Sequence, residues 1–106
     1  MNSSINHKIF NHIVRSPKKF SKNKISFMSR KSAVFSLGFI IPRSLGSAVL
    51  RNRFKRRCRA SLLQLDQRGL LPSHGVIIKP KTVLVGYRDI NESIHLWVDI
   101  IDEVKS

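Results

Sequence analysis

The sequence predicts an α+β fold in which helices with one apolar face pack on a sheet of short strands. Residues 48–67 and 89–104 carry apolar side chains at helical spacing over several turns. The segments before and between them are short, apolar or alternating, and bounded by proline or glycine, which is typical of strands. A chain of 106 residues supports one hydrophobic core but not two, so residues 1–106 are expected to form a single domain.

The N-terminal segment is predicted to be a short helix. Its apolar residues recur with helical spacing: Ile5, Ile9, Phe10, Ile13 and Val14. Ser3 or Ser4 is the expected N-cap, because a side-chain oxygen there accepts a hydrogen bond from the first free backbone amides. Pro17 is expected to end the helix, since the residue before a proline is disfavoured in the helical region.

Two strands are predicted before the long helix. Within residues 20–28, Ile25 and Phe27 alternate with polar neighbours, which indicates one strand with a solvated face. Residues 34–41 form a clearer strand with apolar odd-numbered positions, and Pro42 ends it. On the other face of this strand, Ser36 and Gly38 are small enough to let another group approach closely.

The second half of the chain is predicted to contain the long helix, a buried strand and a last helix. Gly46 and Ser47 precede the long helix of residues 48–67, and Gly69 follows it. Residues 76–79 form a short apolar strand, whereas residues 81–87 fit either a strand or a loop. Asp89 and Glu92 resemble a capping box at the start of the last helix, in which Trp97 is expected to anchor the core.

The charge distribution points to a polyanionic partner. Twenty Lys and Arg residues against six Asp and Glu give a formal net charge of +14. Residues 1–65 contain no acidic residue, and five of the six acids lie from Asp89 onward. Such segregation is expected of a protein that presents one positive surface, so the candidate partners are nucleic acid and an anionic membrane.

The long helix is predicted to have two different faces. At 100° per residue an apolar stripe covers about a third of its circumference: Leu50, Phe54, Cys58, Ser61, Leu62 and Leu65. Residues 51–59 carry five Arg and one Lys, and most of these side chains point away from the stripe. A solvated basic face is the alternative interpretation, but arginine without nearby carboxylates is better suited to bind phosphate oxygens.

The segment "GSAVLRNRFKRRCR" (residues 46–59) resembles the signature of the protein component of bacterial ribonuclease P. Nine positions match the pattern of that family: Gly46, Ala48, Val49, Arg51, Asn52, Arg53, Lys55, Arg56 and Arg59. The stretches "LGFIIPRSLG" and "GVIIKP" and the last helix also resemble that family, so the resemblance extends over about residues 9–104. The sequence departs from the family pattern at residues 42–45, at Ala60, and at Val14, where an aromatic residue is common.

The resemblance implies the fold in more detail. It indicates an α/β (α+β) two-layer sandwich of the ribosomal protein S5 domain 2-like type, with three helices and a central mixed sheet. It also implies an unusual left-handed βαβ crossover through the basic helix.

The resemblance also implies the function. The family protein is the accessory subunit of an endoribonuclease that removes the 5′ leader of precursor tRNA, and the RNA subunit with bound magnesium is the catalyst. The chain is thus expected to bind that catalytic RNA, in a 1:1 complex, and precursor tRNA. By resemblance the RNA-binding residues are the following: Arg51, Asn52, Arg53, Lys55, Arg56, Arg59 and, before the helix, Arg43.

The same resemblance implies that the leader binds between the first helix and the sheet, and the candidate residues are Phe10, Val14, Phe27, Met28 and Ser36. Aromatic side chains in such a site stack on unpaired bases without reading sequence. Phe10 fits equally well a residue that packs the first helix against the core, and for Phe27 a core position is the favoured alternative.

The chain itself is expected to have no catalytic or metal site. Its four histidines are scattered, and neither a pair of carboxylates nor a nucleophile with an adjacent base is visible. The single cysteine cannot form an internal disulfide, and no apolar run reaches the roughly 20 residues that span a bilayer, so a cytoplasmic protein is expected. A basic N-terminus also resembles an organelle transit peptide, but it continues into structured-looking sequence.

Two other function classes remain open. A small basic ribosomal protein, or another structural RNA-binding protein, would share the charge and the fold class. A membrane-active cationic protein is the third class. The apolar stripe of the long helix argues against it, because the stripe is needed to cover the sheet.

Overall fold

The computed structural model describes residues 4–105, and for residues 102–105 only the course of the helix. The helices are α1 (His7–Arg15), α2 (Ala48–Gln67) and α3 (Tyr87–Lys105), and a short 3₁₀ helix, η1 (Arg43–Leu45), precedes α2. The strands are β1 (Lys18–Lys22), β2 (Ile25–Lys31), β3 (Ser36–Phe39) and β4 (His74–Pro80).

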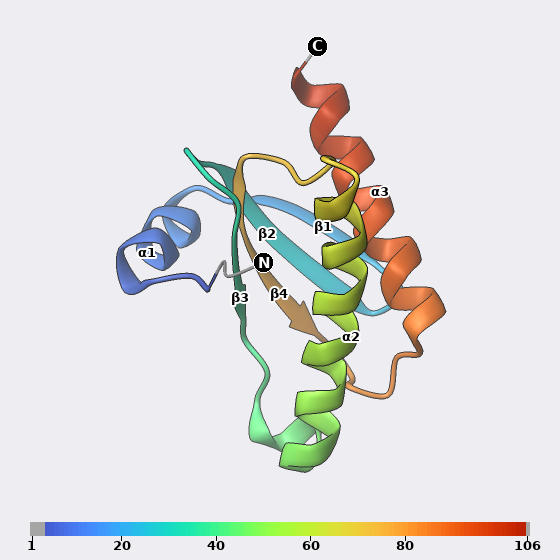
Figure 1. The fold of residues 1–106 in the computed structure, drawn as a ribbon. Coiled ribbons are helices and arrows are strands. Elements are labelled where there is room, and N and C mark those ends of the chain that lie inside the picture. The colour runs from blue at the N-terminus through green and yellow to red at the C-terminus, as the bar shows by residue number, and fades with distance from the viewer. Residues whose placement is uncertain (1–3, 106) are drawn as a thin grey trace.

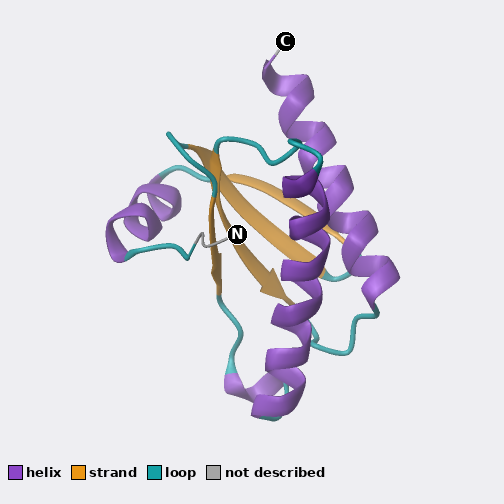
Figure 2. Ribbon diagram, viewed as in Figure 1, coloured by secondary structure: helices purple, strands orange, loops and turns teal. Residues whose placement is uncertain are grey.

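The four strands form one mixed sheet in the order β1-β2-β4-β3. β2 is antiparallel to both β1 and β4, whereas β3 and β4 are parallel. Helices α2 and α3 lie side by side on one face of the sheet, and α1 lies on the other side (Figures 1 and 2). The predicted α+β class with three helices and a mixed sheet is therefore confirmed.

The connection from β3 through α2 to β4 has the left-handed sense that the family resemblance implies. In Figure 1 both strands run downward, α2 lies in front of the sheet, and β4 lies to the right of β3. Parallel crossovers are right-handed in about 98% of cases, so this connection is a rare feature of the fold. It places the basic helix in front of the sheet, to the right of the edge strand β3 in Figure 1.

α1 begins later than the apolar pattern predicts. Its N-cap is Asn6, whose side-chain oxygen accepts a hydrogen bond from the Ile9 amide at 2.9 Å. Ser4 instead forms a parallel bridge with Leu37, and Ser3 lies outside the described residues. The prediction of Ser4 as the cap was wrong because residues 4 and 5 pair with the edge of β3. The helix ends at Arg15, as the position of Pro17 predicts.

Residues 18–31 form two strands where the sequence pattern predicted one. The turn between β1 and β2 consists of Asn23 and Lys24, which both have positive φ, 54° and 64°. Two such residues match the type I′ turn of tight hairpins, but the usual glycine is absent from the sequence. The side-chain nitrogen Nδ2 of Asn23 lies 3.0 Å from each of three acceptors at the start of α3. These are the backbone carbonyl of Asp89, the carboxylate of Glu92 and the hydroxyl of Ser93.

The main core lies between the sheet and the α2–α3 pair. Trp97 is 2% exposed, stacks on Phe27 with 5.8 Å between ring centroids, and donates its indole N–H to the Ser29 hydroxyl. Trp97 therefore anchors α3 as predicted.

Residues 81–86 form a loop between β4 and α3, so of the two alternatives for residues 81–87 the strand is wrong. Val83 and Val85 are buried in the core, while Leu84 between them is exposed. α3 begins at Tyr87, so Asp89 lies in the first turn and is not the predicted cap. A carboxylate in this turn still interacts favourably with the positive end of the helix dipole.

Candidate nucleic-acid interface

The boundaries of α2 agree with the sequence prediction. Ser47 caps the helix, and its hydroxyl accepts a hydrogen bond from the Leu50 amide at 3.3 Å. At the other end Gly69 has a φ of 68°, and the Leu70 amide donates to the Leu65 carbonyl at 2.8 Å. Such a left-handed residue after the last turn is a common helix terminator.

The predicted apolar stripe of α2 faces the core. The buried residues of the helix are Phe54, Cys58, Ser61, Leu62 and Leu65. The Ser61 hydroxyl donates to Asn91 of α3 at 2.7 Å, so the one polar group of the stripe has a partner. This packing holds the helix in place and leaves its basic residues for the surface.

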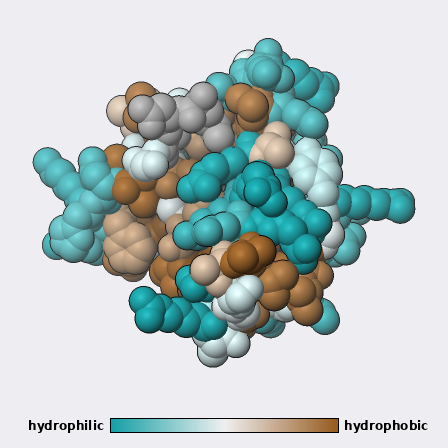
Figure 3. Space-filling view, turned by 60° about the horizontal axis from the view of Figure 1, so that its bottom comes forward, coloured by the Kyte–Doolittle hydropathy of each residue, from teal (hydrophilic) through white to brown (hydrophobic). Residues whose placement is uncertain are grey.

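The outward side of α2 carries the side chains that we call the α2 cationic face. Asn52, Arg56 and Arg59 are exposed, and three further cations are half-buried at its borders: Arg51, Arg53 and Lys55. Arg43, in η1 just before the helix, is exposed as well. Figure 3 looks toward the end of the molecule where η1 and α2 begin, and hydrophilic residues gather there beside hydrophobic ones. The predicted RNA-binding residues therefore lie on one helix and the turn before it.

Two arginines at the borders of α2 are tied to the backbone. Arg51 donates from Nε to the Gly46 carbonyl at 3.2 Å, and Arg57 donates from Nη1 to the Val85 carbonyl at 3.1 Å. Arg57 thus holds the loop before α3. Nε of Arg53 is buried and makes no hydrogen bond within the described residues.

No carboxylate within the described part of the chain pairs with the cations of α2. Exposed like charges along a helix repel each other by a few tenths of a kcal/mol per pair. An RNA backbone placed along this face would remove that repulsion and accept the arginine N–H groups.

Phe39 of β3 lies beneath two cations of α2. The Arg59 guanidinium carbon is 5.3 Å from the ring centroid of Phe39, and the Lys55 nitrogen is 5.9 Å from it. Phe39 also packs edge-to-face on Phe54, with 6.4 Å between the ring centroids. The sequence pattern predicted Phe39 as an apolar strand residue but gave no sign of this contact with the basic helix.

A second basic surface lies on the opposite face of the sheet. A hollow of about 290 Å³, here called the sheet hollow, is lined by residues of three strands and the segment after β4: Lys19, Ser21, Ser26, Phe27, Met28, Lys79, Pro80 and Lys81. Three lysines were missed by the sequence interpretation, because only the pairing of β1, β2 and β4 brings them together.

α1 flanks this same face of the sheet. A side chain at Gly75 of β4 would come within 2.7 Å of Ile13, which places α1 directly against the strand. Gly75 and Lys79 share a face, since side chains alternate along a strand. Phe10 is half-buried and Val14 is 42% exposed on α1, and Met28 on β2 is half-buried, so these three predicted leader contacts reach the surface.

Two predicted leader contacts do not reach this surface. Phe27 borders the sheet hollow, but the residue is 1% exposed and its ring stacks on Trp97 in the core on the other face. Ser36 is 3% exposed and lies 3.1 Å from the position that a Gly75 side chain would take under α1. The small residues of β3 admit the chain's own N-terminal segment, because Ile5 packs onto Gly38. Neither Phe27 nor Ser36 is therefore available to a leader.

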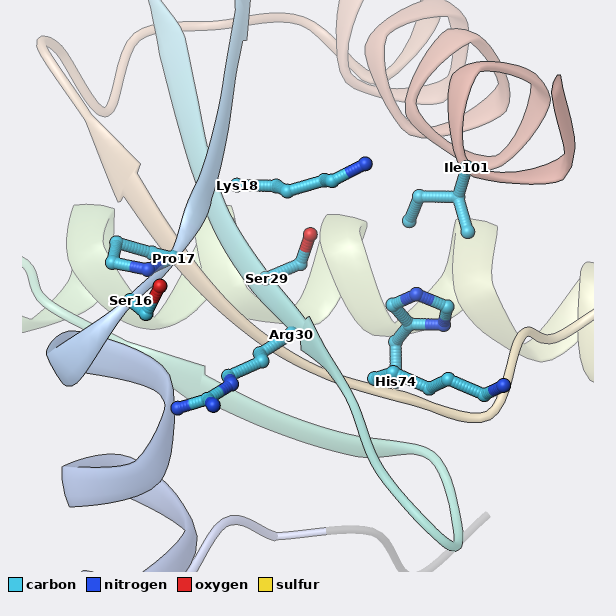
Figure 4. Close-up of a pocket in the computed structure, with 8 residues that line it drawn as sticks. Ser16, Pro17, Lys18, Ser29, Arg30, His74 and Ile101 are labelled. Carbon is cyan, nitrogen blue, oxygen red and sulfur yellow. The ribbon is translucent and has the colours of Figure 1, made fainter. Parts of the chain in front are cut away.

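A larger hollow, of about 550 Å³, lies near the C-terminal part of α3. Figure 4 shows its lining residues, which come from the α1–β1 junction, β2, β4 and α3, with the Lys18 side chain extended toward Ile101. This hollow mixes basic and apolar groups.

The described residues contain no group of three or more His, Cys, Asp or Glu side chains that could hold a metal ion. Burial raises the pKa of the Cys58 thiol to about 12, and the nearby charge of Arg59 opposes this by a smaller amount. A thiol that remains protonated at neutral pH is a poor nucleophile. Within the described part of the chain, no helix has the length and apolar character to cross a membrane.

Comparison with known families assigns the chain to one class of protein. The model of the family described as Ribonuclease P matches residues 5–100. The chain belongs to the ribonuclease P protein family. It is therefore the protein component of a tRNA-processing ribonuclease and has an RNA partner in that complex.

Solved structures of ribonuclease P proteins have the same fold. The protein of Staphylococcus aureus, solved at 2.0 Å, is 18% identical, and the match covers 95% of each chain with a TM-score of 0.77. The ribonuclease P protein of Thermotoga maritima is 18% identical, and the match covers 92% of this chain and 96% of that chain with a TM-score of 0.74. No curated protein sequence matches the chain. The family assignment thus confirms the resemblance seen in residues 46–59.

Proposed function

We propose that this chain binds the catalytic RNA subunit of ribonuclease P through the α2 cationic face, and the 5′ leader of precursor tRNA on the opposite face of the sheet. The observation that carries the proposal is the α2 cationic face itself, whose arginines have no carboxylate partner among the described residues. Arginine binds phosphate oxygens in a bidentate manner, and this makes the face suited to a folded RNA.

The catalyst in this proposal is the RNA, in a 1:1 complex with the chain. The α2 cationic face consists of arginines, a lysine and Asn52, and its positive charges lower the repulsion between phosphates. Magnesium, which the reaction requires, would be bound by the RNA. By bringing RNA strands together, the chain would raise the affinity of the RNA for magnesium. The complex would act in the cytoplasm.

The 5′ leader would bind beside α1. Lys19, Lys79 and Lys81 around the sheet hollow attract the sugar–phosphate backbone, while Phe10 and Met28 offer apolar surface to unpaired bases. Contacts of these kinds tolerate any base, which suits a leader whose sequence varies among precursor tRNAs.

Reconstitution at low magnesium tests the main proposal. A catalytic ribonuclease P RNA is assayed for cleavage of precursor tRNA with and without the chain, over a series of magnesium concentrations. We expect the chain to restore cleavage at magnesium concentrations where the RNA alone is inactive. No effect on cleavage, together with recovery of ribosomal RNA when the chain is isolated with its bound RNA, would favour a ribosomal role instead.

The salt dependence of RNA binding tests the role of the α2 cationic face. If six to eight cations each contact one phosphate, the logarithm of the binding constant falls against the logarithm of salt with a slope of about −4 to −7. Arg56→Gln should make the slope shallower by about one unit, because Arg56 is exposed. Arg57→Gln is the matched variant, and its main effect should be a lower free energy of unfolding, since Arg57 holds the Val85 carbonyl.

Phe10→Ala tests the leader site. We expect weaker binding of precursor tRNA, by about 5- to 100-fold, and unchanged binding of mature tRNA, which lacks the leader. A large fall in the unfolding midpoint, with equal losses for both RNAs, would show that Phe10 packs the core instead.

A further inference from the structure

A shallow hollow on the outer side of α2 lies within the cationic face. Its volume is about 290 Å³, and it is lined by Arg56, Arg59, Ala60 and Leu63. Leu63 is 40% exposed and Ala60 is exposed too, so the hollow has an apolar floor, and two arginines complete its lining. Because Ala60 has no side chain beyond Cβ, the space between Arg56 and Leu63 stays open.

One wall of this hollow is held by an aromatic ring. Arg59 is shared between the hollow and Phe39, since its guanidinium carbon lies 5.3 Å from the ring centroid of Phe39. Guanidinium groups stack on aromatic faces and are planar, so the ring restricts Arg59 to few orientations. Phe39 is in turn held by its edge-to-face contact with Phe54 in the core.

The chemistry of this hollow suits one nucleotide with an unpaired base. Proteins stack unpaired RNA bases on arginine planes as well as on aromatic rings. The Arg59 plane and the apolar surface of Ala60 and Leu63 would contact the base, and Arg56 would contact its phosphate. A purely helical RNA would leave this apolar floor uncovered, because its bases are stacked on one another.

We propose that this hollow on α2 binds a single unpaired base of the partner RNA, that Arg59 stacks on the base, and that Phe39 is the positioning residue for Arg59. The proposal rests on the proposed function, in which RNA lies along α2. It adds a contact to a base where the proposed function requires only contacts to phosphates.

Two short probes separate a base contact from a phosphate contact. One is an RNA of five adenosines, and the other is an abasic ribose–phosphate chain of the same length and charge. We expect the adenosine probe to bind about 5- to 100-fold more tightly, and to shift the methyl NMR signals of Ala60 and Leu63. The abasic probe should leave the Leu63 methyl signals nearly unchanged.

Ala60→Gln is the decisive variant, because glutamine is a good helix former that fills the hollow without changing the charge. It should abolish most of the preference for the adenosine probe while the salt dependence and the unfolding midpoint stay as in the natural chain. Ala33→Gln, at an exposed position between β2 and β3 that lines neither hollow, is the matched control and should keep the preference. Arg59→Lys retains the charge but removes the planar guanidinium group that would stack on the base, so it should also lose the preference for the adenosine probe.

Several results would overturn the proposal. One is an Ala60→Gln chain that still prefers the adenosine probe, and another is an equal loss of affinity for both probes. A third is a natural chain that does not bind the adenosine probe, or that binds it with shifts at Met28 alone. Rescue of cleavage at low magnesium is measured in parallel: if rescue persists in these cases, only the base contact is wrong, whereas failure of rescue contradicts the proposed function.

Discussion

Asn23 and Lys24 illustrate how much of this fold depends on single residues. Both adopt a left-handed backbone conformation in the β1–β2 turn, and this lets the Asn23 side chain reach three acceptors on α3. Asparagine tolerates such a conformation, whereas lysine does so at a cost of about 1 kcal/mol. The turn therefore links the hairpin to α3 at the expense of strain at Lys24.

Replacing Lys24 by glycine should stabilise the protein. Glycine adopts positive φ without a steric penalty, and Asn-Gly is the preferred pair in a type I′ turn. We expect Lys24→Gly to raise the free energy of unfolding by about 0.5–1 kcal/mol in a denaturant titration. Lys22→Gly is the control, and it should lower that free energy because it lies within β1. Equal effects of the two changes would contradict the interpretation of the turn.

Cys58 should be chemically protected in the folded protein. Its pKa is raised to about 12 by burial, against about 8.5 for a free thiol, so the folded chain holds almost no thiolate at pH 8. We expect a disulfide-exchange reagent to label Cys58 slowly in buffer at pH 8 and rapidly in denaturant. Because the pKa of Cys58 is higher in the folded than in the unfolded chain, the protonated thiol contributes fully to folding stability below about pH 8.5. This contribution is lost as the pH rises toward 12. Rapid labelling without denaturant would show that the thiol is accessible.

At the scale of elements, α2 and α1 are attached to the sheet in different ways. α2 buries a full stripe of side chains against the sheet and α3. α1 is a nine-residue helix with one fully buried side chain, Ile13, and its contact depends on the absence of a side chain at Gly75. We therefore expect α1 to be the helix whose position changes most easily.

Gly75→Ala tests this dependence. The added methyl group would lie 2.7 Å from Ile13, 3.1 Å from Ser36 and 3.2 Å from Ile9, so α1 must shift. The expected loss in the free energy of unfolding is about 1–3 kcal/mol, with weaker binding of precursor tRNA if the leader lies beside α1. Gly86→Ala is the control, because nothing lies within 4 Å of the added group. A similar loss in both variants would rule out crowding under α1 as the cause.

At the scale of the whole molecule, the two basic surfaces lie on opposite faces of the sheet. The α2 cationic face and the sheet hollow are separated by the sheet and its core, in a molecule with extents of 39 × 28 × 24 Å. A net charge of +14 on so small a body opposes folding through self-repulsion, which a bound polyanion would relieve. Two RNA segments bound on opposite faces would neutralise the charge of both basic surfaces.

The stability of the free chain should therefore rise with salt. Ions screen charges over about 10 Å at 0.1 M and about 3 Å at 1 M, so added sodium chloride weakens the repulsion among the cations. We expect the thermal unfolding midpoint to increase by several degrees between low and high salt. Adding RNA at low salt should raise the midpoint further. A midpoint that falls with salt would show that ion pairs outweigh the repulsion.

The sequence indicated the elements whose pattern is local and strong. The bounds of α2, its buried stripe and its basic side follow from 20 consecutive residues with one period, a serine cap and a terminal glycine. The core position of Trp97 follows from the same kind of pattern. The resemblance to the family was visible in nine spaced positions of residues 46–59, and the match of the family model to residues 5–100 confirmed it.

Only the tertiary structure decided which residues share a surface. Lys19 and Lys79 are far apart in the sequence and meet because β2 pairs with both β1 and β4. Phe27 and Ser36 were predicted to contact the leader, but the pleat turns Phe27 toward Trp97 and α1 covers Ser36. Local periodicity reports which side of an element is apolar, whereas the choice of neighbour on that side depends on strand order and helix placement, which are long-range properties of the chain.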